Sequence, residues 1–464
     1  MAASRSGRSH RVPERRPANH DGPVRQPVLP RSRTGDNVRL RRRARRRRYA
    51  VGLAALVLVG IVAARLAFSG PGRVPVARPT PPPLPSTQNN IHLGIAFDYN
   101  VSDPRTLAAR VDYIFGGYFV DWNVGPAPPV RHIDAYLPFD TDPYPQYIRG
   151  HSLSAWKAIH PDWIVYRCDR KTPAYYGPGS TNIPLDFTNP AVRAWQVKQI
   201  GELFAQGAQG VGFDDFTFAN FDDRCGVYRN GVWTPLGYPG SWQRNNKYTA
   251  DMISWLRAIS AWIRLHYPTK IITVSINVNA SGLAAFEQAV PYVDMVFDEG
   301  GFTSFGGNNL SGSAWQQEVD ALEFLNANGR AFDVNALVNA RSDATVTPAE
   351  INWVLANYLL VKGAHSYTYI YAAKAPGSSN GAAGYGEFYD RPQYHVPIGR
   401  PTSHRFQSYG VQLRYYSGGL AIVNPSPTAT YTVLLGATYR DPFGHTYTTS
   451  VTLPPTTGIV LLDD

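Results

Sequence analysis

The feature that most constrains the fold is an alternation of strand-like and helix-like segments between residues 91 and 371. Short apolar runs rich in β-branched and aromatic residues alternate there with longer segments whose apolar residues recur at helical spacing. This alternation implies a parallel sheet with helical crossovers, and eight strands in about 280 residues fit a closed (β/α)8, or TIM, barrel. The predicted strands span residues 91–98, 111–122, 162–169, 210–214, 270–280, 292–302, 331–339 and 364–373.

The stretch at residues 210–220, Gly-Val-Gly-Phe-Asp-Asp-Phe-Thr-Phe-Ala-Asn, indicates a strand that runs into two adjacent carboxylates. Because a strand alternates its faces, its two glycines share one face with Asp214, while Val211 and Phe213 share the other. The narrow inner face of a barrel takes small or polar residues. This phase therefore points Asp214 inward at the C-terminal end of its strand, where such barrels keep their active sites. A helix N-cap or a loop carboxylate is the alternative interpretation.

Polar residues also lie at the ends of the other predicted strands. Period two places Asn277 and Asn279 on the inner face of the fifth strand. It does not decide between Asp298 and Glu299 at the end of the sixth strand, so either carboxylate can be the inward one. For Arg167 the alternative role is simple ion pairing, and for Tyr371 it is packing inside the barrel. The predicted substrate-binding residues are Asp98, Arg167, Asp169, Asp215, Asn277, Asn279, Asp298, Asn335 and Tyr371.

Two carboxylates at a barrel mouth, surrounded by amide and aromatic groups, suit the cleavage of a glycosidic bond. One acid protonates the leaving oxygen, and the other attacks the anomeric carbon or activates water. A long loop at residues 216–247, rich in Phe, Tyr and Trp, offers flat faces for sugar rings. The sequence lacks a Gly-x-Ser-x-Gly elbow, a phosphate-binding Walker loop and a His-Glu-x-x-His motif. We therefore predict neither a cofactor nor a metal, with carboxylate-bound calcium as an open alternative.

The basic residues are concentrated at the N-terminus. Residues 1–48 carry sixteen arginines and three acidic residues, whereas the chain from residue 79 onward has a net charge of −5 although the whole chain has +11. The mildly acidic remainder gives no support for nucleic-acid binding by the main domain. We predict that residues 1–48 form a disordered tail, residues 91–399 the barrel, and residues 400–464 a small antiparallel β-sandwich, because short strands separated by Asn, Pro and Gly turns follow the barrel.

Residues 49–68 form an almost wholly apolar run directly after the arginine block. Twenty helical residues span about 30 Å, enough for a bilayer core, and the positive-inside rule keeps the arginines in the cytoplasm. We therefore expect one signal-anchor helix with the C-terminal domain outside the cell, followed by a Pro-rich linker at residues 69–90. A cleaved signal peptide, which would give a secreted protein, is the alternative.

Cys168 and Cys225 are the only cysteines in the chain. Both follow strands that we predict as third and fourth, hence neighbours in the barrel, and an exported location permits a disulfide. The sequence thus predicts a Cys168–Cys225 bridge, with two free thiols as the alternative.

Several short motifs together resemble a known family. They are GVGFDDF after a strand, LDFTNPAVRAW before a helix, VDMVFDEGGF, and a C-terminal GIVLL. Over about residues 91–464 the chain resembles the (β/α)8-barrel glycoside hydrolases grouped as hypothetical glycosyl-hydrolase-like family 15. These are related in layout to α-galactosidase and endo-α-polygalactosaminidase barrels.

The resemblance implies a role for each of two acids. Asp214 falls where such families have the nucleophile or base, and Glu299 falls where they have the general acid/base. Asp215 departs from the pattern, because an amide or a small residue is expected at that position. The implied activity is hydrolysis of an extracellular or cell-envelope polysaccharide. An inactive polysaccharide-binding or envelope-assembly protein and a transglycosylase are the alternatives.

Overall fold

The structure is a computed structural model, and the residues it describes form part of one compact unit, Ala77–Asp464. The predicted tail, membrane helix and linker lie outside the described residues, as does Asp98. Within the described part of the chain, no helix has both the length and the apolar character needed to cross a bilayer. The structure describes residues 90–97, 107, 109–117, 132–142, 150–176, 180–238, 240, 243–373 and 388–464.

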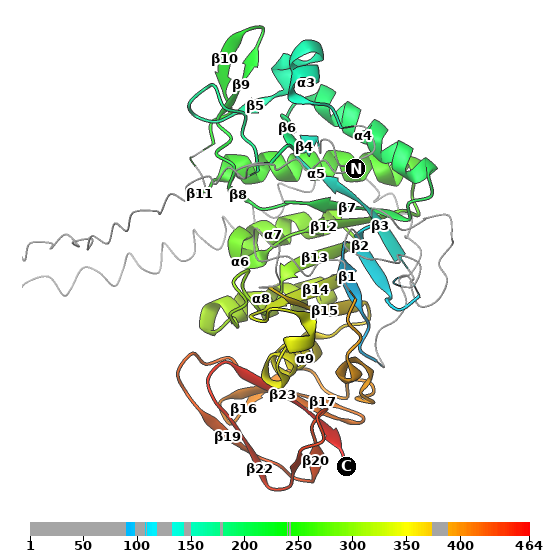
Figure 1. Ribbon diagram of the computed structural model, residues 1–464, viewed down its shortest axis with the longest axis vertical. Helices are drawn as coiled ribbons and strands as arrows, with labels where there is room; N and C mark the ends of the chain where they lie inside the picture. Colours follow the sequence, from blue (N-terminus) through cyan, green and yellow to red (C-terminus); the bar gives the residue numbers. More distant parts are fainter. Residues whose placement is uncertain are drawn as a thin grey trace, which may run out of the picture. The chain divides into compact units, whose positions relative to one another are not determined.

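Eight parallel strands form the central sheet in the order β1-β2-β3-β7-β12-β13-β14-β15 (Figure 1). The sheet closes on itself where Leu93 bridges Thr368 in parallel, and the Thr368 N–H donates to the His92 carbonyl at 3.1 Å. The predicted TIM barrel is confirmed at this level. Its strands are β1 Gly94–Ala96, β2 Tyr113–Gly117, β3 His132–Pro138, β7 Gly210–Asp214, β12 Ile271–Ser275, β13 Met295–Gly300, β14 Ala331–Val338 and β15 Ser366–Ala372.

The prediction that residues 162–169 form the third barrel strand is wrong. The barrel uses β3, whereas the apolar run at residues 162–169 contributes only η2 (Pro161–Trp163) and the two-residue β5 (Val165–Tyr166), which lies outside the barrel. The inner face of β3 carries polar side chains, so β3 lacks the apolar run that marks a buried parallel strand. The residues around β5 are apolar because they pack in a separate core with Trp156 and Ile183.

Helices connect the later barrel strands, and their caps follow sequence rules. Asn189 caps α4 by accepting the Ala191 N–H at 2.9 Å, and Pro190 opens that helix as predicted. Thr347 and Glu350 form a capping box at the start of α9. The described helices are α3 Leu153–Ile159, α4 Pro190–Ala205, α5 Asn246–His266, α6 Val278–Ser281, α7 Leu283–Ala289, α8 Gly312–Ala327 and α9 Pro348–Val361, with 3-10 turns η3 Val290–Tyr292, η4 Asp343–Thr345 and η5 Pro392–His395.

Two insertions extend the chain after β3 and after β7. Strands from both insertions pair in a small antiparallel sheet of order β10-β9-β5, which lies beside α3 (Figure 1). Cys168 and Cys225 form a disulfide between the two insertions, with Cα atoms 5.0 Å apart. Because β5 and β9 pair with each other, this sheet and not the barrel brings the two cysteines together. The short strands are β4 Thr141–Asp142, β6 Ile183–Pro184, β8 Ala219–Asn220, β9 Gly226–Arg229, β10 Val232–Pro235 and β11 Gln243–Arg244.

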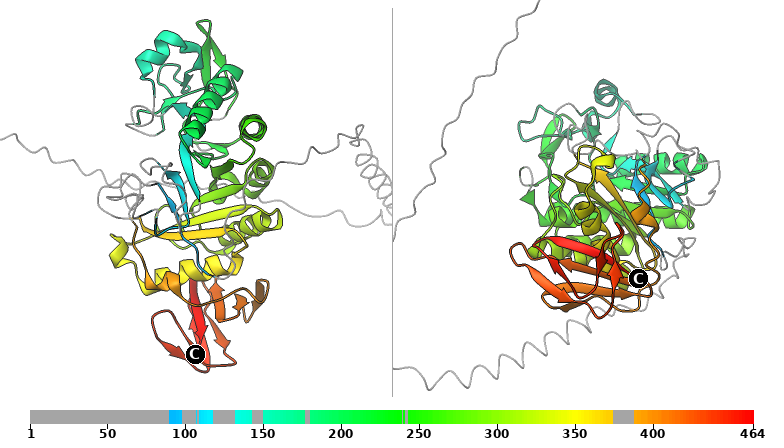
Figure 2. Two further views of the ribbon diagram at one scale, coloured as in Figure 1. Left: turned by 90° about the vertical axis from the view of Figure 1, so that its right-hand side faces the viewer. Right: turned by 60° about the horizontal axis from the view of Figure 1, so that its bottom comes forward.

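The C-terminal strands are antiparallel, as predicted. A six-stranded sheet of order β16-β17-β18-β23-β20-β21 packs one face on α9 and the other on the β19–β22 ribbon, and Figure 2 shows the sheet next to α9. Helix α9 is buried on all sides from Ile351 to Val361 because it lies between the barrel and this sheet. The strands are β16 Phe406–Ser408, β17 Val411–Tyr416, β18 Gly419–Asn424, β19 Tyr431–Leu434, β20 Tyr439–Arg440, β21 Thr446–Tyr447, β22 Ser450–Leu453 and β23 Thr457–Asp463.

Candidate active site

Asp214 ends β7 and points into the barrel, as period two predicts. A Cβ atom on Gly212, two residues earlier, would lie 2.6 Å from the Phe115 ring. Phe115 in turn stacks on Phe297 with ring centroids 4.3 Å apart. These aromatic rings fill the barrel interior below Asp214, and the glycine leaves room for them. Packing therefore requires a small residue at position 212. Asp214 follows on the same face, at the C-terminal end of the strand.

Three donors hold the Asp214 carboxyl group. It accepts hydrogen bonds from the Tyr136 hydroxyl on β3, the Ser275 hydroxyl on β12 and the backbone N–H of Asp215. Burial raises the pKa of Asp214, whereas these three hydrogen bonds oppose the rise because they favour the ionised form. Both neighbouring strands thus fix the orientation of this carboxyl group.

Asp215 lies next to the largest concentration of negative charge in the site. Its pKa is raised well above the ordinary value by burial and by the charges of Asp214, Asp140, Asp222 and Glu299. Its backbone has φ +60°, in the left-handed region that aspartate tolerates better than most residues. A carboxyl group in such surroundings holds its proton near neutral pH and can act as a donor.

Glu299 is the inward residue at the end of β13. Phe297 lies inside the barrel, so Glu299, two residues later, shares its face. The Asn277 side chain donates to the Glu299 backbone carbonyl at 3.2 Å and so ties the strand end to the start of α6. Electrostatic interactions of Glu299 with Asp215 and with Tyr176 place it at the same mouth as Asp214.

Asp298 faces the opposite way and lies 2% exposed behind β13. It contacts the fully buried Glu318 of α8 and accepts the backbone N–H groups of Gly301 and Val278. Burial raises the pKa of Asp298 to about 7, and burial together with Asp298 raises the pKa of Glu318 well above its ordinary value. Two carboxyl groups thus share a pocket outside the barrel, and the structure does not support Asp298 as a substrate-binding residue.

A buried ion network interacts electrostatically with Asp215, and the sequence does not reveal it. The Arg224 guanidinium, 1% exposed, lies 2.6 Å from a carboxylate oxygen of Asp140 and 2.6 Å from one of Asp222. It also donates to the Tyr248 hydroxyl at 3.2 Å. Burial raises the pKa of Asp140 to about 7 although Arg224 opposes that shift. Asp140 lies two residues after the end of β3, so a sequence signal for that strand would also have indicated this carboxylate.

Two predicted residues of the fifth strand have other roles. The strand β12 ends at Ser275, and Asn277 caps α6 by accepting the Ala280 N–H at 2.9 Å. Beyond that cap the chain is helical, so period two no longer applies. The Asn279 side chain donates to Glu318 at 3.4 Å, on the outer side, and the prediction that Asn279 points inward is wrong.

Arg167 and Asp169 do not end a barrel strand, because they follow β5. Arg167 is half-buried and donates to the Tyr175 carbonyl at 3.2 Å. Burial raises the pKa of Asp222, and Arg224 and Arg167 oppose that rise electrostatically, so Arg167 lies near the acids. Asp169 is exposed and accepts three hydrogen bonds from Lys171 and Thr172. These bonds lower the pKa of Asp169 to about 2 and identify it as a turn residue away from the mouth.

Asn335 and Tyr371 lie fully buried within the barrel. The Ala96 N–H on β1 donates to the Asn335 side-chain oxygen at 3.1 Å and to the Tyr371 hydroxyl at 2.9 Å. The Asn335 amide also donates to the carboxylate of Asp333 at 2.6 Å. Both predicted residues therefore join β1 to β14 and β15, and Asn335 pairs in register with Glu299.

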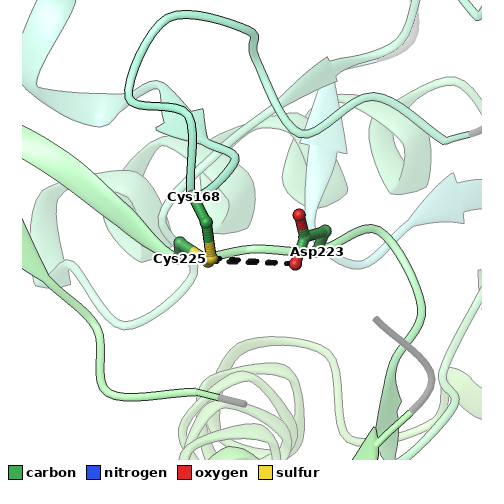
Figure 3. Close-up of side chains that lie close together, drawn as sticks. All are labelled: Cys168, Asp223 and Cys225. Carbon is green, nitrogen blue, oxygen red and sulfur yellow. Dashed lines mark hydrogen bonds between the residues drawn. A yellow bond between two sulfur atoms is a disulfide. The ribbon is translucent and has the colours of Figure 1, made fainter. Parts of the chain in front are cut away.

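The disulfide adjoins Asp223, as Figure 3 shows. Ligand atoms of Cys168, Asp223 and Cys225 lie within 4.8 Å of one another, which is a spacing that metal sites also use. Thiolates are the metal-binding form of cysteine, and both sulfur atoms are engaged in the disulfide here. The cluster is accordingly a structural cross-link.

Comparisons with known proteins give only distant likenesses. No protein-family model and no curated protein matches the sequence, so the family resemblance of its motifs stays a prediction. The chain is similar to solved Aspergillus fumigatus Ega3 in complex with galactosamine, with 14% identity and a TM-score of 0.38 over 63% of this chain and 94% of that chain.

Two further solved structures show the same level of likeness. The glycoside hydrolase domain of PelA from Pseudomonas aeruginosa has 14% identity and a TM-score of 0.36, over 62% of this chain and 98% of that chain. The α-glucosyl transfer enzyme XgtA has 12% identity and a TM-score of 0.46, over 81% of this chain and 99% of that chain. Likenesses at this level carry no argument about function, and the barrel assignment rests on the strand pairing described above.

Proposed function

We propose that the protein is a glycoside hydrolase that cleaves a polysaccharide with two carboxyl groups at the barrel mouth. One observation carries this proposal. Asp214 and Glu299 end strands β7 and β13, which are separated only by β12, and Tyr176 and Asp215 interact electrostatically with both acids. Most glycoside hydrolases cleave the glycosidic bond with two carboxyl groups that flank it, and two acids at one barrel mouth can provide such a pair.

The surroundings of Asp214 suit the nucleophile or base. Three hydrogen-bond donors favour its carboxylate form and fix its direction, so it can attack an anomeric carbon or activate a water molecule. Glu299 is our candidate for the acid that protonates the leaving oxygen. Asp215 is the second candidate, because burial and four neighbouring acids hold its proton in place.

The first test is a screen of the full chain, in mild detergent, against soluble starch, xylan, chitosan and polygalacturonate, with new reducing ends as the readout. Asp214→Asn keeps the shape of the side chain but cannot act as nucleophile or base, so turnover should fall by a factor on the order of 10³ or more. Asp169→Asn, which alters an exposed turn carboxylate, is the matched control and should retain turnover. Equal turnover by wild type and Asp214→Asn would contradict the assignment.

A second experiment separates the two candidate acids. Aryl glycosides with good leaving groups need little protonation, so the variant that lacks the true donor should keep activity on them while it loses activity on the polymer. Glu299→Gln and Asp215→Asn are compared on both substrates. If both variants cleave the polymer normally, neither residue is the acid.

The product pattern distinguishes the rival functions. Transfer products without new reducing ends would indicate a transglycosylase. Binding of a polysaccharide without any cleavage would indicate a binding or envelope-assembly protein. Each result would replace hydrolysis as the activity of this site.

We also propose that the protein is anchored in the cell membrane with the barrel outside the cell. The arginine block at residues 1–48 and the apolar run at residues 49–68 support this topology. Protease added to intact cells should then remove residues 91–464. Complete protection of that region would contradict the proposal.

A further inference from the structure

Tyr176 is an exposed aromatic residue at the candidate mouth to which the proposed mechanism gives no role. It follows a short hairpin in which Tyr166 bridges Pro173 and the Ala174 N–H donates to the Val165 carbonyl at 3.0 Å. The Tyr176 side chain is 39% exposed. An aromatic ring on an inserted segment, held by backbone bonds yet open to solvent, is a place where a ligand can pack.

The ring of Tyr176 is supported from the second insertion. It meets Phe221 edge to face, with centroids 5.2 Å apart and planes at 84°. The Phe221 loop is itself tied, because the Asn220 side chain accepts the Arg224 N–H at 2.9 Å and donates to the Arg224 carbonyl at 3.1 Å. The Arg224 guanidinium lies 5.6 Å from the centroid of the Phe221 ring. These contacts preorganise the ring pair before any ligand arrives.

The disulfide links the two insertions that supply this ring pair. Cys168 precedes Tyr176 in the first insertion, and Cys225 follows Phe221 in the second. The Cys225 N–H also donates to the Tyr166 carbonyl at 3.0 Å. Tyr176 is therefore positioned by a covalent link and by the sheet around it.

Tyr176 interacts electrostatically with the candidate catalytic acids and packs on the loop that carries Arg224. Asp215, and then burial and the charges of Glu299 and Asp214, raise the pKa of Tyr176 above its ordinary value. A phenol in these surroundings stays protonated and keeps an O–H group available for donation. Tyr176 thus combines partial exposure to solvent with an electrostatic interaction with the acids.

We propose that Tyr176 is a substrate-binding residue of this site, whose ring packs against a sugar ring and whose hydroxyl donates to that sugar next to Asp215 and Glu299. The inference rests on the proposed function, since it takes a glycan as the ligand. A sugar presents an apolar C–H surface and a polar hydroxyl rim, and a tyrosine with one exposed part and one polar tip matches both.

The test uses the full chain in mild detergent and the same four polysaccharides: soluble starch, xylan, chitosan and polygalacturonate. Retardation in native gels that contain each polymer reports binding, and new reducing ends report cleavage. Tyr176→Ala should weaken binding or raise KM about tenfold, the effect of one lost aromatic contact. Tyr176→Phe keeps the ring and should show a change of about fivefold, the effect of one lost hydrogen bond.

Tyr415→Ala is the matched control. Tyr415 is 44% exposed and packs against Phe406 with ring centroids 5.7 Å apart, but it lies in the C-terminal sheet. This variant should bind and cleave like wild type. Thermal unfolding of each variant shows whether a loss comes from the site or from the fold, and Tyr176→Phe keeps the packing intact.

The outcomes separate this inference from the proposed function. If a polymer is cleaved and Tyr176→Ala has the wild-type KM, the role of Tyr176 is refuted while hydrolysis stands. If a polymer is bound but not cleaved, and Tyr176→Ala abolishes binding, the role of Tyr176 is supported and hydrolysis is refuted. If no polymer is bound or cleaved, both are refuted.

Discussion

The buried pair of Asp298 and Glu318 makes a quantitative prediction about the pH dependence of stability. The pKa of Asp298 is about 7 in the folded protein, and that of Glu318 lies well above its ordinary value. The folded protein therefore keeps protons that the unfolded chain releases above about pH 4. Each such proton lowers the free energy of unfolding by about 1.4 kcal/mol per pH unit, from the unfolded pKa up to the folded pKa.

Glu318→Gln removes one of these protons while it keeps the size of the side chain. Glutamine stays neutral at every pH, so the variant should gain stability relative to wild type as the pH rises. Because the pKa of Glu318 is raised well above its ordinary value, the difference in the free energy of unfolding should grow from pH 5 to pH 7, by at most about 1.4 kcal/mol per pH unit. Buried acids that do not contact Glu318 titrate equally in both proteins and cancel from this difference, so the measured change belongs to the Asp298–Glu318 pair.

Urea unfolding followed by tryptophan fluorescence at pH 5, 6 and 7 measures the difference directly. Glu323→Gln changes an acid of the same helix that pairs with Arg405 at the surface, 2.8 Å away, and serves as control. Its difference from wild type should vary by less than about 1 kcal/mol over this range. A constant difference between Glu318→Gln and wild type would refute the raised pKa of Glu318.

Three further changes test other parts of the structure. Cys168→Ser opens a disulfide across a sequence separation of 57 residues, and the free energy of unfolding should fall by about 4 kcal/mol in the chain-entropy model; unchanged urea unfolding would contradict this. Gly212→Ala places a Cβ atom 2.6 Å from the Phe115 ring, and overpacking should destabilise the barrel by about 1–3 kcal/mol in the same assay. Arg224→Met leaves Asp140 and Asp222 buried without their cation, so a loss of about 3–5 kcal/mol at pH 8 is expected by circular dichroism. The loss should be smaller at lower pH, because burial raises the pKa of both acids.

The fold was predictable where local pattern and barrel geometry agree. Seven of the eight barrel strands coincide with predicted segments, and the glycine phase of β7 correctly pointed Asp214 inward. Such strands are recognised because their inner faces are small or aromatic and their outer faces apolar. The strand β3 was not predicted because polar inward residues interrupt its apolar run. These residues are His132, Asp134 and Tyr136.

The site was predictable only where it follows directly from a strand end. Asp214 and Glu299 are of this kind. The prediction that Asn279 points inward was wrong because Asn277 caps a helix, so the strand ends earlier than alternation alone predicts. Arg224 and Tyr176 lie on insertions whose position depends on long-range pairing of β5 with β9, and no local pattern in a sequence specifies that pairing.

The complete burial of α9 has a consequence for how the chain unfolds. Gly458 of β23 fits so closely against α9 that a Cβ atom on it would lie 3.0 Å from the Ala356 Cβ. The Arg414 guanidinium donates to the α9 carbonyls of Leu359 and Leu360 and to that of Lys362 just beyond the helix. Removing the strands beyond residue 400 would give this buried helix a solvent-facing side and leave its last carbonyls without the Arg414 donors. The architectural boundary between barrel and sheet is therefore not a cleavage point, and both parts should melt in one cooperative transition.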